Sequence, residues 1–160
     1  MNIIQKITTS YVEEEDRIRL VGENADGETL IIWLSRRLMN RLIPVVFNKI
    51  NVANQPDLAA KLMQEFAQHA AVSSIPKAAP IIPNTESIEW LASSIDIADT
   101  ATHLNLSIKN ETGLAVLSLE ITQVRQWLAI VHHAYIKAAW DDQIWPDWFV
   151  GNHPSAEIRH

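Results

Sequence analysis

The fold is decided by the stretch Arg17–Ile50, RIRLVGENADGETLIIWLSRRLMNRLIPVVFNKI. This stretch predicts a strand, a tight turn, a second strand and a helix. In the first strand, Ile18 and Leu20 alternate with charged residues, as expected of a strand with one face toward water. At the turn, an asparagine can bond its own backbone and a glycine accepts a positive φ. Asn24 and Gly27 therefore favour a type I turn closed by a bulge.

The same order of elements recurs at an offset of 86 residues, over His103–Ile136. Asn110 and Gly113 bracket the turn of this second copy. The apolar positions that coincide are Ile18 with Leu104, Leu20 with Leu106, Leu42 with Leu128, Val45 with Val131 and Ile4 with Trp90. The register fails where Leu34 falls on Glu120 and Pro44 on Ile130. We interpret the pattern as an internal repeat, the alternative being two unrelated hairpin–helix units with convergent turns.

The predicted fold class is α+β, with two β-β-β-α units and an additional helix after the first. In each unit an antiparallel meander packs against helices. The runs Asn2–Val12 and Ile88–Ala98 are expected to be the first strand of each unit. Residues 1–72 then form the first unit, 73–86 a proline-rich connector, 87–150 the second unit with a tryptophan-rich tail, and 151–160 a loose C-terminus. The alternative is one compact domain overall.

Composition indicates an ordinary globular protein, because the 160 residues are 48% hydrophobic and 20% charged. A net charge of −6 repels phosphate backbones, so we expect no nucleic-acid partner. No apolar run approaches the roughly 20 residues that span a bilayer, so we expect no membrane partner. Cysteine is absent and the N-terminus lacks a charged-then-apolar signal, which together favour the cytoplasm.

The second strand of each unit is apolar at successive positions. In the first unit Leu30–Leu34 has no polar residue, and in the second Leu114–Leu119 has only Ser118. Successive side chains of a strand point to opposite faces, so such a strand needs cover on both sides. We therefore expect that the two halves pack together or that the protein is a homodimer.

The helix after Ser35, which can cap it, carries three arginines near its start. Arg36, Arg37 and Arg41 are a candidate anion site, because the last two lie four residues apart on one helical face. The alternative is a solvated face that pairs with the acidic run Glu13–Asp16.

A further helix is predicted from the start signature Asn54-Gln55-Pro56-Asp57 to about Val72. Its apolar residues recur every four positions, which predicts a buried stripe. That stripe consists of Leu58, Leu62, Phe66 and Ala70.

The C-terminal tail WDDQIWPDWF, Trp140–Phe149, holds three of the six tryptophans. Tryptophan and other aromatic residues are enriched at interface hot spots. One interpretation is a hook that docks on a partner, with Trp140, Trp145, Trp148, Phe149 and, elsewhere, Trp33 as the candidate interface. The alternative is a plug that folds back over its own chain, because exposed aromatic patches are a liability in a soluble monomer.

Motifs of known chemistry are lacking, so we expect no metal or other cofactor. The adjacent His132 and His133 have no histidine or acid four residues away, as a zinc helix needs. The sequence contains neither a phosphate-binding glycine loop nor a G-x-S-x-G nucleophile signature. Asp96, Asp99 and His103 could transfer a proton, but a polar strand end explains them as well.

These observations lead to a non-enzymatic cytoplasmic protein that acts through protein contacts, as an adaptor, chaperone-like or assembly component. Its expected partner is a second copy or another protein. The alternative function is a small-molecule or anion-binding domain with a pocket between the two halves. A third hypothesis, an enzyme, requires a cleft that holds Asp96, Asp99 or His103.

Overall fold

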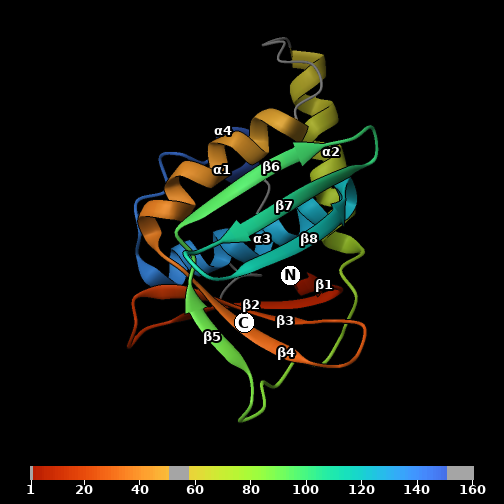
Figure 1. The fold of residues 1–160 in the computed structure, drawn as a ribbon. Coiled ribbons are helices and arrows are strands. Elements are labelled where there is room, and N and C mark those ends of the chain that lie inside the picture. The colour runs from red at the N-terminus through yellow and green to blue at the C-terminus, as the bar shows by residue number, and fades with distance from the viewer. Residues whose placement is uncertain (1, 51–57, 151–160) are drawn as a thin grey trace.

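Two four-stranded mixed sheets with helices packed against them form the fold of the computed structural model, which describes residues 2–50 and 58–150 (Figure 1). The first sheet has the strand order β1-β8-β7-β6 and the second the order β2-β3-β4-β5. The strands of the first half are β1 (Asn2–Ile4), β2 (Lys6–Val12), β3 (Arg17–Glu23) and β4 (Thr29–Leu34). Those of the second half are β5 (Ile88–Leu91), β6 (Ser94–Asp99), β7 (His103–Lys109) and β8 (Leu114–Glu120). The predicted α+β class is confirmed.

Each sheet consists of a three-stranded antiparallel meander from one half and a short strand from the other. The meanders are β2-β3-β4 and β6-β7-β8. Strand β1 of the first half pairs in parallel with β8 of the second half. Strand β5 of the second half pairs in parallel with β4 of the first. The sequence also matched these two short strands, since Ile4 and Trp90 lie 86 residues apart. The two halves are therefore interleaved through β1 and β5.

The prediction of single strands over 2–12 and 88–98 is wrong, because each run is broken where the chain crosses between the sheets. The Ala92 amide donates to the Trp33 carbonyl at 2.9 Å, and the next amide, of Ser93, donates to the Lys109 carbonyl at 2.8 Å. Hydrogen-bond partners thus change sheet within one residue. Alternating hydrophobicity tells which side chains share a face, but it does not tell which strand lies alongside.

The hydrophobic core takes one face of β4 and one face of β8. In β4, Leu30, Ile32 and Leu34 are buried, and the positions between them are half-buried. In β8, the buried residues are Ala115, Leu117 and Leu119. Both strands are internal to their sheets, but Ser118 on the other face of β8 is exposed. The expected cover is therefore complete on one face of each strand and only partial on the other.

Four helices complete the described chain: α1 (Arg36–Ile50), α2 (Leu58–Ser73), α3 (Ile121–Ala138) and α4 (Asp147–Val150). The Ser35 cap of α1 is confirmed, because the Leu38 amide donates to Ser35 Oγ at 3.2 Å. Pro44 lies inside α1 on its exposed side, and the helix continues through it. The α1 residues that face the core are Met39, Leu42, Ile43, Val46, Phe47 and Ile50.

Helix α3 ties the two sheets together because it contacts β2 of one and β7 and β8 of the other. Its Trp127 Nε1 donates to Thr9 Oγ1 of β2 at 3.0 Å. The proline-rich connector runs alongside the same strand, where the Ile81 amide donates to Thr8 Oγ1 at 2.9 Å. The predicted helix-start signature at 54–57 and the loose C-terminus at 151–160 lie outside the described residues.

Candidate functional site

Helix α2 attaches to α3 through polar and small side chains. Gln68, which is completely buried, donates from Nε2 to the Arg125 carbonyl at 2.9 Å. Arg125 Nη2 in turn donates to Gln64 Oε1 at 2.5 Å. Gln126 Nε2 donates to the Ala71 carbonyl at 3.1 Å, where the buried Ala71 lets the two backbones approach. The side of α2 that faces the protein is therefore polar.

Burial has an electrostatic consequence at this junction. Arg125 is 7% exposed, and loss of solvent lowers the pKa of its guanidinium. A buried cation is costly unless hydrogen bonds satisfy it. The contacts from Arg125 to Gln64 and from its carbonyl to Gln68 therefore fix how α2 is turned about its axis.

The opposite side of α2 presents a continuous apolar surface to solvent. We define the α2 face as Leu58, Leu62, Met63 and Phe66, whose side chains are 72%, 43%, 71% and 72% exposed. Residues four apart on a helix are neighbours, so three of these residues form one stripe with Met63 beside it. Figure 1 shows that the N-terminal turns of α2 project from the rest of the protein. The predicted burial of this stripe is wrong.

The physical reason is that a helix has two sides that could face the core, and here the polar side does. Gln64, Gln68 and Ala71 lie on the α3 side, roughly 120–180° around the helix from Leu62. The sequence holds a usable signal for this arrangement. The glutamines lie four apart, and alanines at positions 60, 67 and 71 make that side small enough for close packing.

Trp33, a candidate interface residue, lies half-buried on the face of β4 that points away from the core. In the sheet it is flanked by Arg19 of β3 and Leu91 of β5. Leu91 is exposed, so this row adds a smaller apolar area to the surface. None of these residues belongs to α2, and the interface role of Trp33 stays a prediction.

The tryptophan-rich tail packs inside its own chain. Trp140, Trp145 and Phe149 are buried, and Trp148 is half-buried. The Phe47 ring of α1 meets Trp145 and Phe149 edge-on, at centroid distances of 5.6 and 5.2 Å. This placement fits the plug interpretation, and it removes three of the four tail rings from any surface that a partner could reach.

Asp16, the last residue of the acidic run, anchors the start of the tail. Its Oδ1 accepts a hydrogen bond from the Trp140 indole at 3.0 Å and one from the Tyr11 hydroxyl at 2.7 Å. The Tyr11 contact, followed by that of Trp140, lowers the pKa of Asp16. The same bond to Asp16 raises the pKa of Tyr11 to about 12. One of the four acids therefore has a structural role.

The three arginines of the candidate anion site are exposed on α1. Arg36 lies close enough to Asp16 for its charge to contribute to the lowered pKa of that carboxyl. This relation favours the alternative of a solvated arginine face near the acidic run. Arg37 and Arg41 line none of the pocket described next.

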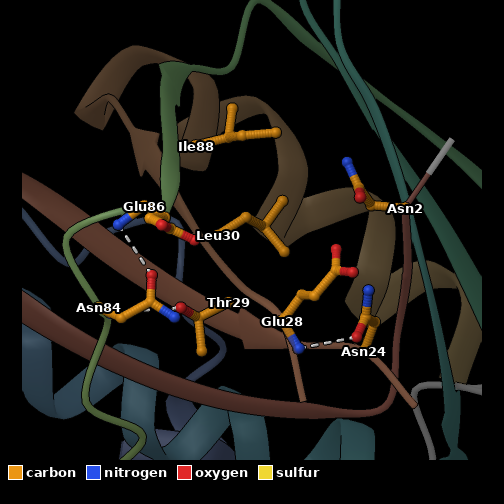
Figure 2. A pocket seen from close by; sticks show the side chains of 8 residues that line it. All are labelled: Asn2, Asn24, Glu28, Thr29, Leu30, Asn84, Glu86 and Ile88. Carbon is orange, nitrogen blue, oxygen red and sulfur yellow. Dashed lines mark hydrogen bonds between the residues drawn. The ribbon is translucent and has the colours of Figure 1, made fainter. Parts of the chain in front are cut away.

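A polar pocket of about 210 Å³ opens between the start of β1, the turn before β4 and the segment that leads into β5 (Figure 2). Its lining consists of Asn2, Asn24, Glu28, Thr29, Leu30, Asn84, Glu86 and Ile88. The Asn24 and Asn84 side chains are held by their own turns, because each Oδ1 accepts an amide hydrogen at 2.9 Å, from Glu28 and Glu86 respectively. Both charged groups are carboxylates, so the pocket suits an amine or hydroxyl group better than an anion.

The candidate proton-transfer residues have separate partners. Asp99 pairs with Lys49 of α1 at 3.0 Å, and Asp96 pairs with Lys109. His103 Nδ1 lies 2.8 Å from Thr102 Oγ1.

His132 is buried against the Trp145 ring, with centroids 4.8 Å apart. Burial and, to a lesser extent, Lys137 lower the pKa of His133.

Two features of the described residues bear on other functions. Nowhere in 2–50 and 58–150 do three or more His, Asp or Glu side chains gather as metal ligands would. Within the same ranges, every helix is too short or too polar to span a bilayer.

Comparison of the chain with protein-family models, curated proteins and solved structures finds no match.

Proposed function

We propose that this chain is a non-enzymatic protein that works through protein–protein contacts, as an adaptor, chaperone-like or assembly component. The observation that carries the proposal is the α2 face. Monomeric proteins rarely expose a contiguous apolar patch of this kind unless it binds something. Here the patch lies on a helix whose polar side is committed to α3, so the exposed apolar side has no use within the described chain.

Two further proposals concern the internal repeat and the location of the protein. Both sheets combine a three-stranded meander with one parallel strand from the other half. An offset of 86 residues carries β3, Arg17–Glu23, onto β7, His103–Lys109. This agreement supports an internal repeat, and the same offset carries α2 onto a range that includes α4. We also propose the cytoplasm as its location, on the strength of the missing cysteine.

The proposal is tested by photo-crosslinking in the native host of the protein. A photoreactive phenylalanine analogue replaces Phe66, and a matched variant carries it at the exposed Ser118 on the outer face of β8. We expect discrete protein adducts from position 66 and background from position 118. The proposal is overturned if both positions give the same background.

A second candidate function is the binding of a small amine or polyol, and the pocket between the halves favours it. Glu28 and Glu86 supply two negative charges, and amide side chains supply hydrogen-bonding groups. Titration calorimetry with 1,4-diaminobutane tests it. Binding that is lost in Glu28→Gln supports this function, and no heat in the unaltered protein rejects it for amines.

A further inference from the structure

The α2 face is close to neutral although the chain as a whole is acidic. The charged residues of α2 are Lys61 and Glu65, one of each sign, while the net charge of the chain is −6. A strongly basic or acidic partner would find no matching charge on this surface. A partner with the same neutral, apolar character fits it better.

We infer that the α2 face docks on the α2 face of a second copy, with the two helices antiparallel. The inference rests on the proposed function and names its partner. In a two-fold pair the same surface meets itself, so a patch must be self-complementary. Leu58, Leu62 and Phe66 satisfy this condition, since a two-fold axis near Leu62 places the outer two opposite each other.

The area supports a real but weak dimer. The exposed parts of the four side chains, counted over both copies, remove on the order of 1,000 Å² of apolar surface from water, near the lower limit for a specific interface. Ala59 and Ala70, both exposed on the same side, add a rim without bulk. The projecting N-terminal turns of α2 let a second copy approach (Figure 1).

Light scattering on the purified full chain over a range of concentrations tests the inference. We expect a monomer–dimer equilibrium and a dissociation constant of micromolar order. Phe66→Asp should weaken dimerisation by roughly tenfold or more, because it puts a carboxylate into each end of the apolar contact. The matched control Ala98→Asp, at an exposed position on β6, should leave dimerisation unchanged.

Engineered cysteines test the orientation, because the chain itself has none. In the antiparallel pair Leu62→Cys lies near the two-fold axis and should form a disulfide-linked dimer on mild oxidation. Leu58→Cys, which faces Phe66 of the other copy, should not. Circular dichroism checks that each variant is folded.

Three results would overturn the inference: a monomer at high micromolar concentration, a dimer that Phe66→Asp leaves intact, or a disulfide-linked dimer that forms through Leu58→Cys and not through Leu62→Cys. The last result rejects the antiparallel contact even if a dimer exists. If the purified chain is monomeric while position 66 cross-links to a different protein, this inference fails and the proposed function stands. Background cross-linking together with a monomer rejects both.

Discussion

The side chain of Ile4 packs so closely on Gly22 that a Cβ added to the glycine would be crowded. An added Cβ would be 3.1 Å from three carbon atoms of Ile4. Ile4 belongs to the exchanged strand β1, and Gly22 lies in β3 of the other sheet. The lack of a side chain at Gly22 therefore lets β1 pass close to β3 of the other sheet.

Gly22→Ala should destabilise the protein by about 1–3 kcal/mol, because the extra methyl overpacks a buried contact. Urea unfolding followed by tryptophan fluorescence measures the loss. The double variant Ile4→Val with Gly22→Ala should be more stable than the sum of the single effects, since a smaller side chain makes room. Additive losses would show that the contact does not limit packing.

Phe149→Ala should cost about 3–5 kcal/mol, as expected for a fully buried ring. The ring contacts Phe47 of α1 and Trp145 of the tail, so its loss loosens the whole aromatic cluster. Urea unfolding measures the effect, and Trp148→Ala, at a half-buried position, should cost less. A loss below about 1 kcal/mol for Phe149→Ala would show that the tail does not close the core.

In α2, replacing a polar residue should cost more folding stability than replacing an aromatic one. Gln68→Ala should destabilise the protein by about 1–3 kcal/mol, because it removes a buried hydrogen bond between α2 and α3 and leaves unfilled space. Phe66→Ser should change the free energy of unfolding by no more than about 0.5 kcal/mol. Both are measured by urea unfolding at a concentration at which the chain is monomeric. A large effect of Phe66→Ser there would place this ring in the core.

The two tyrosines should resist ionisation in the folded protein. The hydrogen bond to Asp16 raises the pKa of Tyr11 from 10.0 to about 12, and burial raises the pKa of Tyr135 still further. At pH 10 the folded protein should show little phenolate absorbance, whereas the chain in urea should be half ionised.

The sign of the accompanying stability change follows from these directions. Because the folded pKa of Tyr11 is raised, its contribution is complete below pH 10 and is lost as the pH rises toward about 12. The variant Tyr11→Phe should lack this loss, which urea unfolding at two alkaline pH values measures. Half ionisation of the folded protein at pH 10 would contradict both shifted pKa values.

Local features of the fold were predictable because they depend on neighbours in sequence. Asn24 Oδ1 accepts the Asp26 amide at 3.0 Å, and Gly27 has a φ of 80°, as the turn requires. In the second hairpin, Asn110 Oδ1 accepts the Thr112 amide at 2.9 Å. The Ser35 cap and the three-stranded meanders follow from equally local rules.

The candidate site was not predictable in the same way. The apolar stripe of α2 was recognised as a stripe, but its direction depends on whether Gln68 or Phe66 meets Arg125, which is 57 residues from Gln68. The tail rings were recognised as hydrophobic, but their burial depends on Phe47 of a distant helix.

The sequence by itself determined the turns, the caps and the alternation of apolar residues, because each arises from steric and hydrogen-bonding rules that act over a few residues. Only the tertiary structure decided that β1 and β5 exchange sheets and that α2 turns its polar side inward. Those choices depend on which distant surfaces fit together: Ile4 over Gly22 and Gln68 against Arg125 are contacts between elements that no local pattern relates.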